Sequence, residues 1–359
     1  GYRVITKNES IQTYNAGWVV NFDELSNGTN DIAFVLSDNA QNLVNTAKVF
    51  HILKDVISPT VDQRLTFNQG LWYRSPPSWM TSVDIDFYDS GESLLWNLAY
   101  IISADGVQKV VTISERVLSN SYLANWVLSW DLLSEGQNDI WLRFNDRAGN
   151  EVTTYSFTFR KDDIDPVIGN TVAVTGGTMS RWYNSAPGWL TSVSVNFSDV
   201  GGSHLGASYY GIRQGDDPVV WDRITGNLSV DTFNELWPVS WNLLPNGQST
   251  IDVRVSDNAG NSRNMSEILV IRKDVIVPTY SVLFNPNEDR FVNTWYNAEP
   301  EWLSAISIHF EDFGSSNLHS IYYTVTNVSG STQYPLLRND PLQAYPWDWA
   351  VSWSVLANG

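Results

Sequence analysis

Aspartates recur at corresponding places along this 359-residue chain and are its main candidates for chemistry. One set opens the phrase Asp-x-Ala-Gly-Asn or its variant with Gln, one follows Lys in short segments that end in Pro, and one lies in Gly/Ser-rich stretches. In that order the sets are Asp38, Asp146 and Asp257; Asp55, Asp162 and Asp274; and Asp89, Asp199 and Asp312. Paired carboxylates can act as the acid and base of a glycosidase. Because these residues return with each copy of a motif, a shared fold explains them better than catalysis does.

Other catalytic groups are sparse. The four histidines, His51, His204, His309 and His319, do not recur at one place in the repeats, and none belongs to a His-x3-His pair. The chain has no cysteine, which excludes disulfides, thiolate metal sites and Cys nucleophiles. Gly-x-Ser-x-Gly and P-loop motifs are absent as well. We therefore predict that this chain is not an enzyme.

An aromatic phrase shows how the elements that position these residues are organised. A Trp-Tyr pair is followed by Pro-x-Trp, and the second and third copies begin 110 and 113 residues after the copy before them. The copies are Trp72, Tyr73 and Trp79; Trp182, Tyr183 and Trp189; and Trp295, Tyr296 and Trp302. Such a period is too long for a solenoid unit and fits a whole small domain. The chain is therefore a tandem array of similar domains.

A repeated dipeptide sets the domain boundaries. Asn27-Gly28, Glu135-Gly136, Asn246-Gly247 and Asn358-Gly359 occupy matching places, and residues 1–28 align without gaps with residues 332–359. We predict a partial repeat at 1–58, complete repeats at 59–165 and 166–277, and a second partial repeat at 278–359. From this pattern we expect the chain to be a segment of a longer protein.

Alternation with a period of two residues predicts strands. Val83, Ile85 and Phe87 alternate with polar residues, and the later copies of the repeat keep this pattern. Ile140, Leu142 and Phe144 alternate in the same way, and a Trp-x-φ-x-Trp pattern at Trp126, Leu128 and Trp130 places aromatics on one face. No segment keeps a helical period for about ten residues. About seven short strands in about 110 residues indicate an all-β array of antiparallel β-sandwich domains.

Three phrases carry a more specific resemblance. They are Ser256-Asp257-Asn258-Ala259-Gly260-Asn261, Lys273-Asp274 through Pro278-Thr279, and Phe197-Ser198-Asp199 through Ser203, each with copies elsewhere in the chain. Together they resemble the immunoglobulin-like (Ig-like) repeats of large prokaryotic surface proteins and adhesins. The resemblance covers the whole chain and implies an extracellular, cell-surface location. It identifies an architecture well and a ligand poorly.

In the adhesins that this chain resembles, acidic residues of turns and linkers can share a Ca²⁺ ion, which takes six to eight oxygen ligands. The resemblance therefore implies candidate ligands at each junction: Asp38 with Asp55; Asp146 with Asp162, Asp163 and Asp165; and Asp257 with Asp274. The main turn phrase also fits a tight hairpin that needs no ion. Lys54, Lys161 and Lys273 offer an alternative, because an ammonium group could neutralise the linker carboxylates instead.

Charge and composition restrict the partners. The chain has 21 basic and 39 acidic residues and a net charge of −18, which argues against nucleic acid, and no stretch is long and apolar enough to span a membrane. Six Asn-x-Ser/Thr sequons permit glycosylation without arguing for it, at Asn8, Asn27, Asn196, Asn227, Asn264 and Asn327.

Repetition, short Pro-containing linkers and the lack of catalytic groups favour a structural role. We predict a non-enzymatic part of a rod, filament or lattice, with self-association or neighbouring repeats as its partners. Two alternatives stay open: an adhesin stalk, and a glycan-binding module that uses the recurring Trp-Tyr and Pro-x-Trp aromatics. The same aromatics could instead pack one domain end against its neighbour.

Overall fold

The computed structural model describes residues 3–6, 11–174, 181–217, 219–226, 228–282, 294–345 and 348–356, without the side chains of 338–340 and 348. These residues form β-strands, turns and short 3-10 helices, and no α-helix occurs among them, which confirms the predicted all-β class. In this part of the chain there is no helix that could cross a membrane. The chain divides into two compact units, one of Gly1–Ile164 with Gly201–Ser203 and the other of Asp165–Val200 with His204–Gly359.

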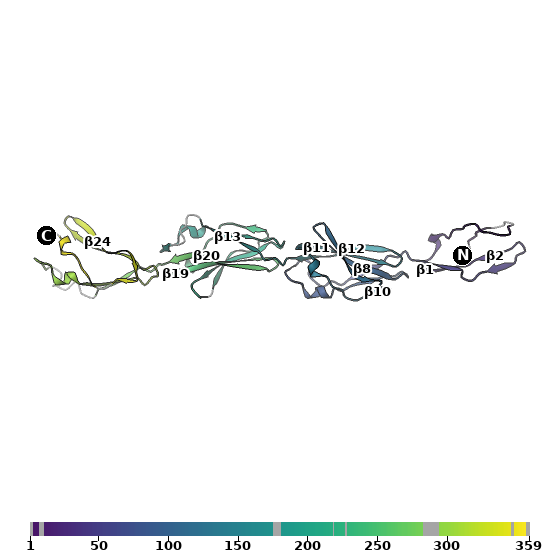
Figure 1. Ribbon diagram of the computed structural model, residues 1–359, viewed down its shortest axis with the longest axis horizontal. Coiled ribbons are helices and arrows are strands. Elements are labelled where there is room, and N and C mark those ends of the chain that lie inside the picture. The colour runs from purple at the N-terminus through teal and green to yellow at the C-terminus, as the bar shows by residue number, and fades with distance from the viewer. Residues whose placement is uncertain are drawn as a thin grey trace. The chain divides into compact units, whose positions relative to one another are not determined.

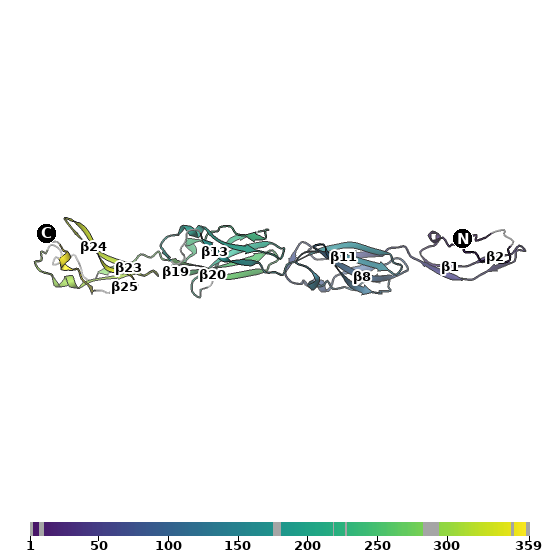
Figure 2. The ribbon, with the colours of Figure 1, turned by 45° about the horizontal axis from the view of Figure 1, so that its top comes forward.

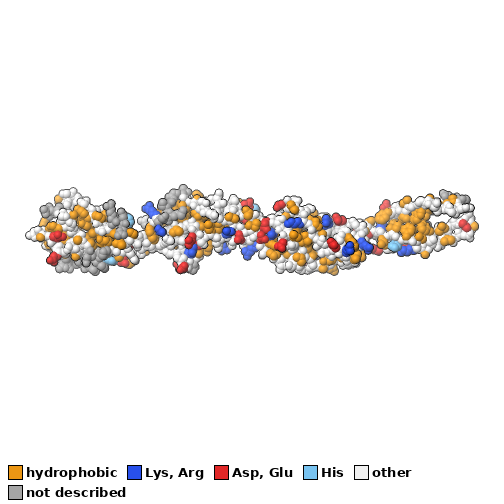
Figure 3. Space-filling view, in the orientation of Figure 1, with side chains coloured by type: hydrophobic (Ala, Val, Ile, Leu, Met, Phe, Trp, Pro, Cys, Tyr) orange, Lys and Arg blue, Asp and Glu red, His pale blue; other side chains and the backbone are white. Residues whose placement is uncertain are grey.

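The first segment of the first unit, the described part of residues 1–58, forms two antiparallel strand pairs. Its elements are η1 (Phe22–Glu24), β1 (Gly28–Ile32), β2 (Val35–Ser37), β3 (Leu43–Asn45) and β4 (Phe50–Lys54). Strand β1 pairs with β4 and β2 with β3, both antiparallel. Hydrophobic side chains gather on the visible surface of this part, at the right of Figure 3, and Leu36, Leu43 and Val44 are each more than half exposed.

The complete repeat of the first unit is a sandwich of two sheets (Figure 1). Its elements are β5 (Thr60–Gln63), β6 (Trp72–Tyr73), η2 (Ser78–Thr81), β7 (Ile85–Tyr88), β8 (Leu95–Ala104), β9 (Val107–Glu115), β10 (Ser121–Tyr122), η3 (Trp130–Leu132), β11 (Gly136–Asp146) and β12 (Glu151–Lys161). The sheet orders are β10-β7-β5 and β6-β12-β11-β8-β9. The neighbouring strands β8 and β11 of the larger sheet can be followed in Figure 2.

The complete repeat of the second unit has the same topology. Its elements are β13 (Val167–Val174), β14 (Trp182–Tyr183), η4 (Gly188–Thr191), β15 (Val193–Ser198), β16 (Leu205–Arg213), β17 (Val220–Gly226), β18 (Thr232–Phe233), η5 (Trp241–Leu243), β19 (Gly247–Asp257) and β20 (Ser262–Lys273). The sheets run β13-β15-β18 and β14-β20-β19-β16-β17. One fold is thus built twice from sequences that share only the recurring phrases.

The last segment of the second unit, the described part of residues 278–359, forms two further sheets. Its elements are β21 (Thr279–Val282), η6 (Glu301–Ser304), β22 (Ile306–Glu311), β23 (Leu318–Asn327), β24 (Gly330–Leu342), β25 (Ala344–Tyr345), β26 (Asp348–Trp349) and η7 (Trp353–Val355). Strand β22 pairs with β21, β25 and β26, while β23 and β24 form a separate hairpin.

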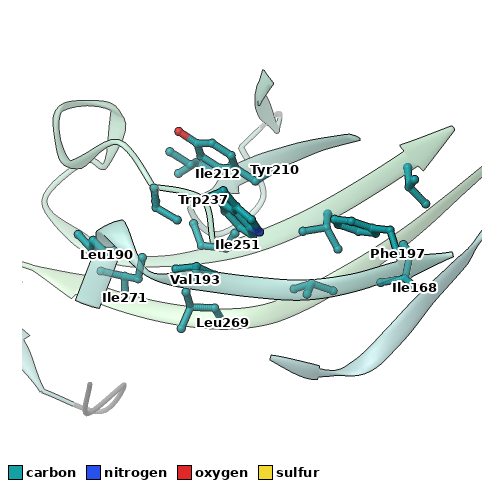
Figure 4. Packing of buried hydrophobic residues seen from close by; sticks show 14 of the residues in the cluster. Ile168, Leu190, Val193, Phe197, Tyr210, Ile212, Trp237, Ile251, Leu269 and Ile271 are labelled. Atoms are coloured by element: carbon teal, nitrogen blue, oxygen red, sulfur yellow. The ribbon is translucent and has the colours of Figure 1, made fainter. Parts of the chain in front are cut away.

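The predicted alternation fills the space between the sheets. Along β11, Ile140, Leu142 and Phe144 are almost fully buried, while the residues between them are only partly buried. Figure 4 shows the equivalent core of the second unit, where the Tyr210 ring stacks on Trp237 at a centroid distance of 5.3 Å. Burying one such large apolar side chain contributes about 1.5–3 kcal/mol. The segment around Trp126 supplies core side chains as expected but makes only an isolated bridge to Val83.

Candidate metal centre in the first unit

Three aspartates from separate segments converge at one end of the complete repeat of the first unit. Asp55 lies in the linker after β4, Asp89 in the Gly/Ser-rich loop after β7, and Asp146 at the end of β11. One carboxylate oxygen of each lies within 4.8 Å of the others. Asp89 and Asp146 are buried, with 4% and 0% of their surface exposed, and Asp55 is half-buried. Repulsion between three ionised carboxylates at this spacing opposes the arrangement unless a cation or a proton offsets it.

The turn between β11 and β12 holds Asp146. Its Oδ1 accepts a hydrogen bond from the Asn150 backbone N–H at 2.9 Å, and its Oδ2 accepts one from Asn150 Nδ2 at 2.6 Å. The same Nδ2 donates to the carbonyl of Asp55 at 3.2 Å, so the turn also grips the linker. Gly149, with φ +93°, takes the left-handed conformation that closes the turn. In the first repeat Gln41 adopts φ +69° at this place, so the turn keeps its shape despite a side chain.

The linker carboxylate is fixed from both sides. Asp55 Oδ1 accepts the Ile57 N–H at 2.9 Å, and Oδ2 accepts the Ser93 N–H at 3.0 Å. Burial acts to raise the pKa of Asp55, but the hydrogen bonds from Ser93 and Ile57 outweigh it and hold the pKa below its ordinary value. Gly91 explains the recurring glycine of this loop, because a Cβ there would overlap the Asp55 carboxylate. The folded linker therefore favours the ionised form of Asp55.

Asp89 is the least satisfied member of the three. Its Oδ1 accepts the Gly91 N–H at 2.9 Å, while its Oδ2 is buried and has no hydrogen-bond partner. Burial raises the pKa of Asp89, and the charges of Asp55 and Asp146 raise it further against the opposing Gly91 N–H. A buried acceptor without a partner costs about 1–3 kcal/mol, and more when it is charged.

The three carboxylates fit a hard cation. Two oxygens that each lie about 2.4 Å from one Ca²⁺ are at most about 4.8 Å apart, which agrees with the observed grouping. All three candidate ligand atoms are carboxylate oxygens, and none of the three carboxylates forms an ion pair among the described residues. Asp89 Oδ2 supplies a free ligand atom, and an ion would neutralise the charge that burial and repulsion leave uncompensated. The residues present therefore fit Ca²⁺.

Two of the three linker lysines bond to backbone carbonyls and form no ion pair with the linker aspartates among the described residues. Lys54 Nζ donates to the carbonyls of Phe22 and Leu25, at 2.9 and 2.8 Å, and lies 4.6 Å from the centre of the Phe22 ring. Lys273 makes the corresponding bonds to Trp241 and Leu244, at 3.1 and 2.7 Å. These ammonium groups cap their own domain, and the alternative in which they neutralise the linker aspartates is wrong for these two positions.

Lys161 makes a different set of contacts. Its Nζ pairs with Glu135 at 2.8 Å and Asp163 at 3.2 Å, and it lies 5.1 Å from the Trp130 ring centre. Glu135 also accepts the Asp163 N–H at 3.0 Å. Asp163 thus serves Lys161, and Asp165 is exposed and belongs to no carboxylate group among the described residues.

The grouping differs from the expected one in a systematic way. Asp38 was expected beside Asp55, but it is exposed and hydrogen-bonds to Asn42 within its own turn. Asp274, expected beside Asp257, accepts the Ser316 N–H of the following Gly/Ser-rich loop at 2.8 Å. Asp55 and Asp274 therefore bond to the repeat that follows them, because a strand separates each of them from the turn of its own repeat.

The other repeats show matching contacts within each unit. Asp162 accepts the N–H groups of Ile164 and Ser203 in the first unit. In the second unit Asp257 accepts the N–H and Nδ2 of Asn261. Asp312 accepts the Gly314 N–H at 2.9 Å, as Asp89 accepts that of Gly91. Asp162 belongs to the first unit, and Asp199 and Asp257 belong to the second.

The aromatic phrase packs mostly inside its own domain. Trp79 stacks on Phe67 at 3.8 Å, and Tyr73 stacks on Phe159 at 5.0 Å. In the second unit Trp189 is buried and donates through Nε1 to the Tyr183 hydroxyl at 3.1 Å. The first Trp of each phrase varies, since Trp72 and Trp182 are half-buried and Trp295 is 86% exposed. In the last copy Tyr296 and Trp302 pack edge to face at 6.2 Å. This packing gives the glycan hypothesis no exposed platform common to the three copies.

The remaining predicted positions are on the surface. The sequons at Asn27, Asn196, Asn264 and Asn327 are exposed, and Asn8 and Asn227 lie outside the described residues. His204 pairs with Asp231, and His319 lies 3.0 Å from the neighbouring Ser320 hydroxyl. Neither contact assembles a nucleophile with both a base and an acid among the described residues.

Comparisons with known proteins concern the fold. No protein-family model and no curated protein matches the chain. Its fold is similar to the tetra-tandem repeat in the extending region of a large adhesion protein, at 15% identity over 94% of this chain and 77% of that one, with a TM-score of 0.36. A Ca²⁺-stabilised adhesin that helps an Antarctic bacterium bind ice matches at 16% identity over 90% and 74% of the two chains, with a TM-score of 0.29. A 1.5-MDa bacterial ice-binding adhesin matches at 13% identity over 83% and 88%, also with a TM-score of 0.29.

Proposed function

We propose that this chain is a structural, non-enzymatic segment of an extracellular surface protein of the adhesin type, in which Ca²⁺ stabilises the joints between successive Ig-like domains. Its place would be a rod, a filament or a lattice built from domains in series. The observation that carries the proposal is the convergence of Asp55, Asp89 and Asp146, with the buried Asp89 Oδ2 left without a partner.

The linker contacts support a mechanical role for the linker as a spacer between domains. In the first unit the segment after β4 is held on one side by Lys54 on the carbonyls of its own repeat and on the other by Asp55 on Ser93 of the next repeat. The Val56 N–H adds a bond to Asn27 Oδ1 at 3.3 Å. A cation among the three aspartates would add bonds that cross the same joint. A linker held at consecutive residues transmits force better than a free one, which suits a spacer.

Small-angle scattering of the 359-residue chain, in calcium and in chelator, tests the proposal. We expect the largest particle dimension to be better defined in calcium and to spread toward shorter values in chelator. The D55N/D89N double variant should behave in calcium as the unchanged chain behaves in chelator. Identical scattering in both conditions would contradict the proposal that calcium stabilises the joint.

The stalk and the self-associating filament are separate outcomes of one further measurement. Sedimentation of the calcium-loaded chain over a range of concentrations distinguishes a monomeric spacer from an assembling one. Growth of the sedimenting species with concentration supports a filament or lattice, and a constant monomer supports a stalk.

A further inference from the structure

The outer face of the large sheet in the first unit presents three rows of side chains that cross four paired strands. The strand registers place Glu151, Asn145, Asn97 and Glu115 in one row; Thr153, Arg143, Ala99 and Thr112 in the next; and Tyr155, Trp141, Ile101 and Val110 in the third. These residues alternate with the core residues Leu98, Tyr100, Leu142 and Phe144, so they face away from the core. Neighbouring rows are about 7 Å apart and neighbouring strands about 4.8 Å.

A cavity of about 190 Å³ lies among the first two rows. Its lining includes Ala99, Arg143, Glu115 and Glu151, with Asn97 beside them. Among the described residues Arg143, Glu115 and Glu151 form no hydrogen bond or ion pair with one another or with any other side chain. Charged groups of both signs thus surround the cavity, and their side chains can form hydrogen bonds with a ligand.

An aromatic pair lies in the third row, next to the row of Arg143 and Ala99. Trp141 lies two residues before Arg143 on β11 and packs edge to face with Tyr155 of β12 at 5.5 Å. Tyr155 is 43% exposed and Val110 is 50% exposed, so this row offers apolar surface to solvent. Aromatic surface next to carboxylates, an amide and a guanidinium can hold a ligand that has an apolar face and a rim of hydroxyls.

The corresponding face of the second unit is built differently. Tyr209 pairs with Arg254 on β19, as Ala99 pairs with Arg143 on β11. A tyrosine therefore stands where Ala99 leaves the hollow. Asp252 takes the place of Trp141 along the strand and pairs with Arg213 at 3.4 Å. The hollow, the unpaired charges and the aromatic pair are thus properties of one repeat and are not required by the fold.

We propose that this face of the first complete repeat binds a neutral oligosaccharide of at least two sugar residues. One sugar occupies the hollow over Ala99, where Glu115, Glu151 and Asn97 accept or donate hydrogen bonds to its hydroxyls and Arg143 donates to its oxygens. The adjoining sugar stacks on Trp141 beside Tyr155. This site shares no residue with the three-aspartate cluster or with the Trp-Tyr phrase, so it stands or falls independently of the proposed function.

Isothermal titration of the 359-residue chain with cellohexaose, maltohexaose, chitohexaose, mannohexaose and xylohexaose tests the site. We expect saturable binding of at least one of the five sugars. The A99Y variant, which copies the residue of the second unit, should fold normally and weaken binding at least tenfold, as should W141A. The matched control W221A removes a Trp that is 40% exposed in β17 of the second unit and should leave the affinity unchanged.

Three results would overturn the proposal. They are the absence of saturable binding by all five sugars, binding that A99Y and W141A leave unchanged, and an equal loss with W221A. The unfolding temperature of each variant is measured first, and the conservative R143Q variant gives a second readout if W141A proves unstable. Because Arg143 points away from the core, R143Q should weaken binding without lowering the unfolding temperature.

Discussion

Replacing Asp89 with Asn should change stability in opposite directions with and without calcium. In chelator the Asp89 charge faces those of Asp55 and Asp146, with oxygens within 4.8 Å of one another. At an effective dielectric of about 20, two unit charges about 4.8 Å apart repel by roughly 3.5 kcal/mol. Water at the half-buried Asp55 weakens this, so we expect D89N to stabilise the calcium-free chain by about 1–3 kcal/mol. That corresponds to about 4 °C or more in the unfolding transition of a domain of this size.

In calcium the same change removes a ligand. At a calcium concentration about 100 times the dissociation constant, the bound ion stabilises the folded chain by about 2.7 kcal/mol. D89N should lose most of this stabilisation. Differential scanning calorimetry of both chains, with calcium and with chelator, measures the reversal. The control D105N removes an exposed carboxylate from the turn between β8 and β9 and should behave the same in both conditions. If D89N lowered the transition equally in calcium and in chelator, the repulsion argument would be refuted.

Further predictions concern pH, the loop glycine, the linker lysine and the aromatic phrase. Burial and the neighbouring charges raise the pKa of Asp89, so folding favours its protonated form. In chelator the free energy of unfolding should therefore rise as the pH falls through the raised pKa toward the ordinary value. A pH series of denaturant melts measures this rise, and D89N should lose it. G91A should push the Asp55 carboxylate aside and weaken calcium binding at least tenfold by titration calorimetry, whereas G188A, whose new Cβ meets no atom within 4 Å, should not. K273M deletes two bonds to carbonyls and should cost about 1–3 kcal/mol in chemical denaturation, with no change in calcium affinity at the Asp55 site. W79A removes a ring stacked on Phe67 and should cost about 3–5 kcal/mol without affecting sugar binding.

The sandwich fold could be predicted because the patterns that specify its strands and turns lie within short stretches of sequence. The alternation of Ile140, Leu142 and Phe144 fixes which face of β11 is buried, and the recurring phrases fix the spacing of turns. The partner of Asp55 could not be predicted in the same way. The carboxylate bonds to Ser93, which is 38 residues away, and only the packing of the next repeat on the linker decides this.

A signal for the correct grouping was nevertheless present in the sequence. Each Gly/Ser-rich stretch has Gly two residues after its Asp and Ser two residues after that Gly, as in Asp89, Gly91 and Ser93. The structure shows that Gly91 leaves room for the linker carboxylate and that Ser93 donates to it. The partners of Lys54 could not be predicted either, because they are backbone carbonyls, which no side-chain pattern reveals. The outer-face cavity depends on a strand register that places Ala99 beside Arg143, and this too is a matter of tertiary structure.

The most direct test of the calcium joint is a crystal structure of the 359-residue chain grown with a lanthanide in place of calcium, with anomalous scattering measured at the lanthanide edge. We expect a peak about 2.3–2.6 Å from carboxylate oxygens of Asp55, Asp89 and Asp146, with Asp89 Oδ2 among the ligands. A well-ordered joint with no peak among these three carboxylates would contradict it.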